Sequence, residues 1–281
     1  MTPDEYCQDK AAASGSSFYY SFLFLPPERR RAITALYAFC REIDDVVDEC
    51  HDAQIAATKL AWWREELARV YAGNPQHPIG QALRPATERF NLPHELLSEI
   101  IDGMEMDLTQ SRYLDFTALS LYCYRVASVV GLLAAEIFGY QDRHTQKYAH
   151  DLGMAFQLTN IIRDVGEDAR RGRVYLPQDE LARFGIVDAE LLSATPPADF
   201  PDKFRRLMEF QIERAETYYA EALRQLPERD RKPQRAGLIM AAIYRATLTE
   251  IKRDANQVFS QRVSLSPLRK LWLAGLTWIK G

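Results

Sequence analysis

Apolar residues along this chain recur three and four positions apart, and charged residues fill many of the positions between them. This spacing places apolar side chains on one face of an α-helix, whereas the alternation typical of a half-buried strand does not recur. Pro26-Pro27-Glu28 opens the first long segment, and Gly73-Asn74-Pro75 closes the second. We therefore predict an all-α protein, with helices over about 27–49, 53–71, 79–90, 93–108, 117–138, 142–170, 202–225 and 233–259, and a short one from 267.

The segment 172–201 breaks this pattern because it carries four prolines and two glycines. We predict an irregular flap there. No low-complexity linker or convincing internal repeat divides the chain, so residues 1–281 are interpreted as a single domain with one large core. In a bundle of this kind, side chains from facing helices can build a site at the centre.

Two polar stripes interrupt the apolar pattern, and the residues of each stripe share one helix face. The first stripe consists of Tyr37, Arg41, Asp44 and Asp48. The second consists of Gln157, Asn160, Asp164 and Asp168. Each stripe therefore ends in a pair of aspartates one helical turn apart.

Carboxylates one turn apart lie about 6 Å from each other along the helix axis and repel. Two such pairs are tolerated if a cation lies between the helices, and oxygen ligands with room for water and phosphate favour magnesium over zinc or calcium. The predicted metal ligands are Asp44, Asp48, Asn160, Asp164 and Asp168. The alternative for either cluster alone is a solvated acidic surface.

The stripes and their flanking residues resemble the two motifs of the squalene and phytoene synthase family. Residues 37–48 resemble the first motif, and residues 157–168 with Arg170-Arg171-Gly172-Arg173-Val174-Tyr175-Leu176-Pro177 resemble the second. The resemblance runs from Ser14 to about Arg262, and residues 16–22 and 25–30 most resemble the bacterial hopanoid-pathway branch, which makes presqualene diphosphate. It implies an isoprenoid-synthase-type bundle with a central substrate cavity and two or three Mg²⁺ ions.

The same resemblance implies roles for individual residues. The expected catalytic residues are Asp44, Asp48, Tyr122, Asp164 and Asp168. The expected substrate-binding residues are Ser14, Gly15, Ser16, Ser17, Phe18, Tyr37, Arg41, Gln157, Arg163 and Tyr244. The chain departs from the family in carrying Ser14-Gly15 where a His-Ser pair often stands, which affects the individual contacts rather than the location.

Several of these residues have a structural alternative. Arg41 and Arg163 either hold diphosphate oxygens or pair with neighbouring acids. The segment 14–18 is otherwise a turn or helix cap, and Tyr122 is otherwise a core tyrosine with a satisfied hydroxyl. A run of small residues either lines a tunnel for an isoprenoid tail or allows close helix packing. These small residues are Ala127, Gly131 and Ala134 or Ala135.

Other candidate groups receive no role. Asp102, Glu105 and Asp107 form a third acidic patch that we interpret as ordinary helix surface, and the five histidines show no ligand spacing. The four cysteines form no CxxC pair, which favours reduced thiols in the cytoplasm over a disulfide framework. A net charge of -4 gives no general attraction to nucleic acid or anionic lipid.

Two segments bear on membrane contact. The most apolar one, Val126 to Gly139, is too short to span a bilayer and is predicted to be a buried helix, and no signal peptide is visible. The C-terminal residues 267–281 mix tryptophan, leucine and basic residues. They either dock on the inner membrane surface or pack back onto the bundle.

We interpret the chain as a magnesium-dependent prenyltransferase that condenses two farnesyl diphosphates head to head to presqualene diphosphate. NADPH is not expected because no glycine-rich βαβ nucleotide fingerprint is present, and separate squalene-forming enzymes would act downstream. The nearest alternatives are dehydrosqualene synthase and phytoene synthase. A class I terpene cyclase fits the repeated aspartate pattern less well, and a non-catalytic assembly protein would be expected to lose aspartates that this chain retains.

Overall fold

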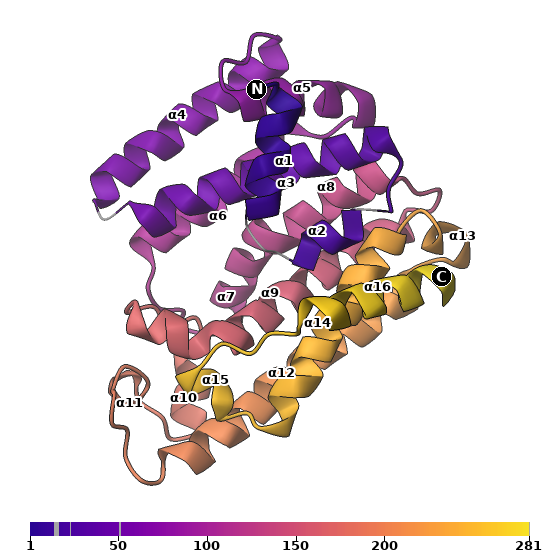
Figure 1. Ribbon diagram of the computed structural model, residues 1–281. Coiled ribbons are helices and arrows are strands. Elements are labelled where there is room, and N and C mark those ends of the chain that lie inside the picture. Colours follow the sequence, from indigo (N-terminus) through magenta and orange to yellow (C-terminus); the bar gives the residue numbers. More distant parts are fainter. Residues whose placement is uncertain (14–16, 23, 51, 281) are drawn as a thin grey trace.

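The computed structural model describes residues 1–13, 17–22, 24–50 and 52–280, which form the helical domain in Figure 1. The first half contains α1 (Pro3–Ala13), α2 (Ser17–Phe22), α3 (Pro27–Glu49), α4 (Ala53–Ala72), α5 (Pro78–Phe90), α6 (His94–Thr109), α7 (Phe116–Cys123), the π-helical turn η1 (Tyr124–Ser128) and α8 (Val129–Phe138). The second contains α9 (His144–Arg170), α10 (Gln178–Arg183), α11 (Asp188–Leu191), α12 (Phe200–Gln225), α13 (Glu228–Arg231), α14 (Arg235–Arg253), α15 (Gln257–Ser260) and α16 (Pro267–Lys280). Within these ranges the β-structure amounts to a single bridge between Arg112 and Val174.

The predicted all-α fold is confirmed, and local signals explain several helix ends. Asp52 caps α4 by accepting hydrogen bonds from the backbone of the first turn, and Gly73 ends it with a φ of 85°. Several elements differ from the prediction. The helix expected over 233–259 is interrupted after Arg253, and the short helices α2, α10, α11 and α13 were not predicted. α1 was not predicted either, because it buries only Cys7 and Ala11 and has no clear amphipathic stripe.

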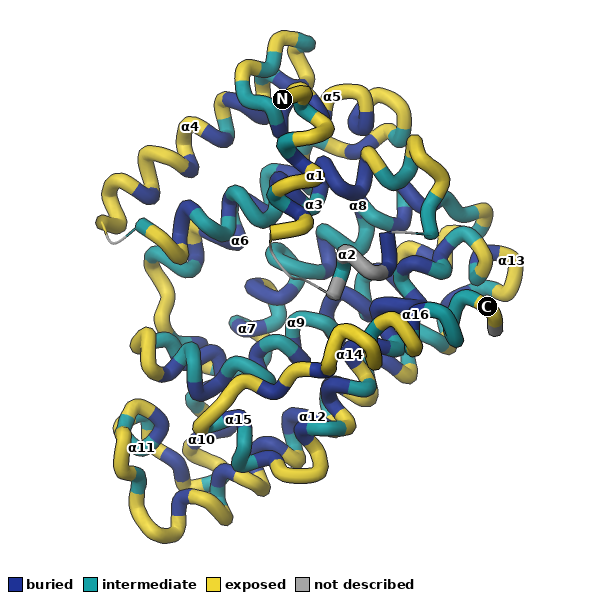
Figure 2. The backbone as a smooth tube through the Cα atoms, viewed as in Figure 1, coloured by how far each residue is buried: buried dark blue, intermediate teal, exposed yellow. Residues whose placement is uncertain are grey.

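Most buried apolar side chains of the described residues belong to two large clusters, and a third, small cluster lies between α14 and α16. One large cluster lies among α3 to α6 and α8, and the other surrounds α9, α12 and α14. In Figure 1 the first group lies above the second, and Figure 2 shows buried residues along the inner faces of both. Because α3 belongs to one cluster and α9 to the other, the two predicted aspartate helices lie on opposite sides of the boundary.

Glycines bring the central helices into close contact. A Cβ atom at Gly131 of α8 would lie 2.5 Å from the carbonyl oxygen of Ala149, and one at Gly153 of α9 would lie 2.5 Å from the Cα of Ser128. By its length and composition alone, the continuous helix 116–138 could span a membrane. In this fold it packs against α6 and α9 inside the bundle, as a buried helix was predicted to do.

The C-terminal helix α16 packs on α14 and α2. Ala274 is fully buried there, and the Trp278 ring stacks on Phe24 with centroids 5.0 Å apart. The packing alternative for this segment is therefore observed. Its opposite face leaves Leu268, Trp272 and Ile279 exposed, so the question of membrane contact stays a prediction.

Candidate active site

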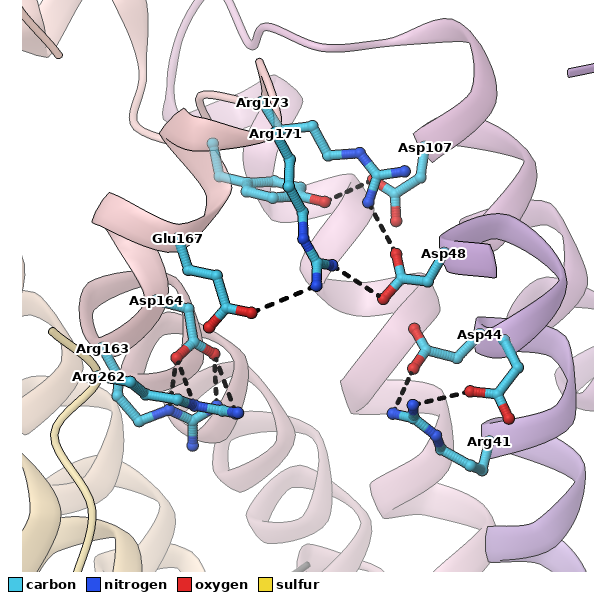
Figure 3. A network of polar contacts seen from close by, with 12 residues as sticks. Arg41, Asp44, Asp48, Asp107, Arg163, Asp164, Glu167, Arg171, Arg173 and Arg262 are labelled. Carbon is cyan, nitrogen blue, oxygen red and sulfur yellow. Dashed lines mark hydrogen bonds and ion pairs between the residues drawn. The ribbon is translucent and has the colours of Figure 1, made fainter. Parts of the chain in front are cut away.

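A polar cavity of about 770 Å³ lies at the boundary between the two groups of helices. Asp44 and Asp48 enter it from α3, and Asp164 and Asp168 enter it from α9. Figure 3 shows the aspartate-bearing faces of the two helices turned toward each other. The structure thus brings the two sequence stripes, about 120 positions apart in the chain, into one site.

Each stripe is neutralised in part by its own arginine. Arg41 lies 2.9 Å from Asp44 and 2.7 Å from Asp45 on α3. On α9, Arg163 bends back so that its Nε donates to Asp164 at 2.8 Å, although an ideal helix would point the two residues about 100° apart. The intrahelical pairing considered for both arginines is the state seen here.

Two further arginines cross the opening of the cavity. Arg171 lies 3.4 Å from Asp48 and 3.3 Å from Glu167, so it joins α3 to α9. Arg173 donates to the other oxygen of Asp48 at 3.0 Å. Figure 3 shows Arg171 between Glu167 and Asp48. Arg173 lies at the start of the irregular segment predicted over 172–201, so this segment begins with a side chain that contacts an aspartate of the first stripe.

The chain after α15 completes the rim. Arg262 lies 3.0 Å from Asp164, and Lys270 of α16 lines the same cavity. Burial, together with the nearby positive charges of Arg163 and Arg262, lowers the pKa of Lys270. Positive charge therefore collects beside Asp164, where a diphosphate could be held.

The nearby arginines compensate Asp44 and Asp168 only in part. Burial, with the charges of Asp164 and Glu167, raises the pKa of Asp168 to about 7. Burial, with the charge of Asp48, raises the pKa of Asp44 to about 6. The Oδ1 atom of Asn160 is buried without a hydrogen-bond partner. Such a set of under-compensated oxygen ligands fits a hard divalent cation.

An apolar arm of about 200 Å³ continues from the polar cavity. Phe18, Tyr37 and Gln157 line both spaces, so they mark the junction. Phe18 contacts Tyr37 and Tyr244 with ring centroids 5.8 and 6.1 Å apart. The predicted substrate-binding residues Phe18, Tyr37, Gln157 and Tyr244 are thus gathered where the polar and apolar spaces meet.

Both readings of the small-residue run apply. Ala127, Gly131 and Ala134 line the apolar arm, and Gly131 also permits the close approach of α9. Ala135 is buried outside this arm. The predicted contacts at Ser14, Gly15 and Ser16 lie outside the described residues, and at Ser17 only the start of α2 is described.

Tyr122, predicted as a catalytic residue, lines the polar cavity, but the surface assignment of Asp107 was wrong. Asp102 pairs with Arg64 on the outer surface as expected, but Asp107 of the same helix lines the polar cavity. Its carboxylate accepts hydrogen bonds from Tyr122 at 2.9 Å and from Tyr175 at 2.8 Å. A helix turns by about 100° per residue, so residues close in sequence can face opposite ways. Asp107 is therefore a cavity residue.

Sequence reasoning gave no role to Arg171, Arg173, Arg262 or Lys270. Arg171 and Arg173 lie in the stretch Arg-Gly-Arg-Val-Tyr-Leu-Pro, which is part of the family resemblance, so the sequence could have indicated a role for them. Arg262 and Lys270 lie in a segment without a motif, and only the fold brings them to the cavity.

Comparison with known proteins identifies the family. The squalene/phytoene synthase family model matches residues 11–269. The chain belongs to this family. It is 37% identical to the 15-cis-phytoene synthase of Synechococcus elongatus, over 95% of this chain and 89% of that protein. It is 38% identical to the chloroplastic phytoene synthase of Narcissus pseudonarcissus over 94% of this chain, and the match spans 63% of that protein's length.

Two solved structures of the squalene/phytoene synthase family share the fold. One is a dehydrosqualene synthase, with a TM-score of 0.84 and 27% identity over 99% of this chain and 96% of that chain. The other is a squalene synthase from Alicyclobacillus acidocaldarius, with a TM-score of 0.78 and 28% identity over 90% of this chain and 94% of that chain. The family consists of prenyltransferase-type head-to-head synthases that act on prenyl diphosphates and use a divalent metal.

Proposed function

We propose that this chain joins two allylic prenyl diphosphates head to head, and that phytoene synthesis from geranylgeranyl diphosphate is its reaction. One observation supports this reaction most directly: two facing aspartate stripes line a polar cavity that continues into an apolar arm. The curated relatives named above, both phytoene synthases, support this product.

In this proposal the chain's own residues bind the diphosphate and protect the cation. Arg163, Arg171 and Arg262 exchange carboxylate partners for diphosphate oxygens, which they can hold with two hydrogen bonds each. The ligands Asp44, Asp48, Asn160, Asp164 and Asp168 would hold magnesium, which when bound supplies positive charge that stabilises the leaving diphosphate. The apolar arm excludes water from the allylic cation.

The coupling step conserves atoms and charge. The carbon–oxygen bond of one substrate breaks, and the double bond of the second substrate attacks the resulting cation. Loss of one proton then closes a cyclopropane ring, with the second diphosphate still attached. Tyr122 lies at the polar cavity beside Asp107, where its oxygen can approach the reacting carbons.

Presqualene diphosphate synthesis from farnesyl diphosphate is the second candidate. The arm leads away from the aspartates, because its residues lie toward the N-terminal ends of α3 and α9. Phe138 at the end of α8 and Tyr148 near the start of α9 line the end of the arm that is farthest from the aspartates. Their bulky rings shorten the arm, which favours a substrate with the shorter fifteen-carbon chain. The dehydrosqualene and squalene synthase structures described above add support for a thirty-carbon product.

A substrate competition tests both candidates. The purified chain is given farnesyl and geranylgeranyl diphosphate together, with magnesium and with or without NADPH, and products are analysed by mass spectrometry before and after phosphatase treatment. Phytoene as the main product supports the first candidate, and a thirty-carbon cyclopropyl diphosphate that accumulates regardless of NADPH supports the second. If neither substrate is consumed, both candidates are wrong.

Two phenylalanine variants test whether the apolar arm holds the hydrocarbon chain of the substrate. Phe138→Leu should shift the preference toward geranylgeranyl diphosphate, because it removes ring volume from the end of the arm. Phe39→Leu is the matched control: Phe39 is equally a core ring, 1% exposed, but lines neither the cavity nor the arm. The ratio of the two substrates consumed is the measurement, and an equal shift in both variants would contradict the assignment of this arm.

A further inference from the structure

Asp107 joins three separate elements at the edge of the cavity. Its carboxylate lies on α6, Tyr122 lies on α7, and Tyr175 follows α9 in the segment that carries Arg173. The two hydroxyls donate to different carboxylate oxygens, at 2.9 and 2.8 Å, and lie 3.5 Å from each other. The Tyr122 and Tyr175 rings stack with centroids 5.1 Å apart. The carboxylate therefore fixes two phenols in one orientation.

This arrangement sets the direction of both hydroxyl protons. A phenol has one proton to donate, and an ionised carboxylate can only accept. When Tyr122 and Tyr175 both donate to Asp107, the lone pairs of their oxygens remain available to accept. Both tyrosines line the polar cavity, so these lone pairs are accessible to a bound substrate.

We propose that Asp107 is a positioning residue for the coupling reaction and the final acceptor of the proton that ring closure releases. In this step the substrate C–H bond breaks and its electron pair forms the last bond of the cyclopropane. The proton passes to the Tyr122 oxygen while the Tyr122 hydroxyl proton passes to the Asp107 carboxylate. Charge balances, because the cation becomes neutral and the carboxylate becomes a carboxylic acid. This inference rests on the function proposed above.

The surroundings of Asp107 suit this role. Burial raises its pKa to about 6, against the opposing effects of the Tyr175 hydrogen bond and the Arg173 charge, so it accepts a proton more readily than a surface aspartate. Burial also raises the pKa of Tyr122 well above its usual range, which keeps the phenol protonated between turnovers. Tyr113 packs against both rings, with centroids 5.5 and 5.9 Å away, and holds them in place.

The test is a double-mutant cycle with Asp107→Asn and Tyr122→Phe. The two phenols donate to different oxygens of Asp107, and asparagine replaces one of these oxygens by an NH2 donor that can accept no proton. Asp107→Asn should therefore lower kcat about a hundredfold while KM changes little. Because Asp107 is inferred to act through Tyr122, the double variant should be no slower than Tyr122→Phe alone. Asp102→Asn is the matched control, since Asp102 lies on the same helix but pairs with Arg64 outside the cavity, and its kcat should match wild type.

Binding separates this role from a purely structural one. Calorimetric titration with magnesium and inorganic pyrophosphate should give the same affinity for Asp107→Asn and wild type, because the diphosphate contacts remain. Unchanged kcat in Asp107→Asn, fully multiplicative rate losses in the double variant, or a loss of pyrophosphate binding equal to the loss of kcat would each overturn the inference. Absence of wild-type turnover would instead overturn the proposed function, and this inference with it.

Discussion

Asp164 and Asp168 lie one turn apart on α9, yet their surroundings differ. Asp164 lies between Arg163 and Arg262, whereas Asp168 has no ion-pair partner in the part of the chain that the structure describes. Like charges one helical turn apart repel, so an asparagine at either position would relieve that repulsion if neither aspartate had a partner. The structure restricts that expectation to Asp168, because removing Asp164 would leave the largely buried Arg163 without its partner.

The two asparagine variants should therefore change stability in opposite directions. Asp168→Asn should raise the free energy of unfolding of the metal-free protein by roughly 1 kcal/mol, and Asp164→Asn should lower it by about 2 kcal/mol. Both should lower turnover about a hundredfold or more. Denaturant unfolding and product formation measure the two effects. Near-wild-type turnover in either variant would contradict its assignment as a metal ligand.

The raised pKa values of Asp44 and Asp168 predict a pH dependence. An unfolded aspartate titrates near pH 3.9, so the folded metal-free protein binds more protons than the unfolded chain between that pH and about 7. The contribution of these groups to stability therefore falls as pH rises through this range. Cations compete with those protons, so magnesium affinity in the presence of pyrophosphate should rise from about pH 5.5 to about pH 8. Calorimetry at both values is the measurement, and a flat profile would contradict the prediction.

Residue roles could be predicted where a spacing rule or the family resemblance applied. The aspartate stripes follow helical spacing, so Asp44 and Asp164 were found from sequence. Asp107 was assigned to the surface together with Asp102 and Glu105, because these three acids show no one-turn pairing, and the assignment holds only for the two that bind Arg64. Its cavity position depends on Tyr175, 68 positions away, and no local pattern contains that information.

At the scale of elements, the contact between α9 and η1 determines how the cavity wall is built. Gly153→Ala should lower the free energy of unfolding by about 2 kcal/mol, because the added Cβ would meet the backbone of Ala127 and Ser128. Gly275→Ala is the control: it also lies within a helix, but no atom lies within 4 Å of its added Cβ. That variant should be neutral or up to about 1 kcal/mol more stable. Equal destabilisation of both would contradict the packing argument.

The exposed face of α16 is the element that we expect to contact a membrane surface. Leu268, Trp272 and Ile279 are 79%, 63% and 82% exposed at helical spacing, while Ala274 on the opposite face is fully buried. Replacing Leu268 and Trp272 by serine should weaken co-sedimentation with phospholipid vesicles about tenfold or more, because burial of each side chain contributes about 1.5 kcal/mol or more.

The control for this helix lies on α4, far from α16 in Figure 1. Ile55 and Trp62 are also exposed, at 52% and 38%, and their replacement by serine should leave vesicle binding unchanged. If the wild-type chain does not sediment with vesicles, or if both pairs weaken binding equally, α16 is not the membrane contact.

At the scale of the whole molecule, the fold class followed from periodicity because apolar residues recur at helical spacing along most of the chain. The assembly of those helices into two groups could not be predicted in this way. It depends on close contacts such as Gly131 with Ala149, and on pairs such as Arg112 with Asp188, that join distant parts of the chain. The cavity exists because these two groups meet along their polar stripes.

Arg171 and Arg173, which cross the opening of the cavity, affect how magnesium and diphosphate bind. Magnesium alone would have to separate Asp48 from Arg171 and Arg173 and leave the arginines unpaired, while diphosphate alone would take the arginines and leave the carboxylates unpaired. When both arrive, every displaced group gains a new partner. Each ligand should therefore strengthen binding of the other by the same factor, which calorimetric titration of pyrophosphate with and without magnesium can measure. Because ion pairs within the protein cross the opening of the cavity, magnesium and diphosphate bind together with higher affinity than either ligand binds alone.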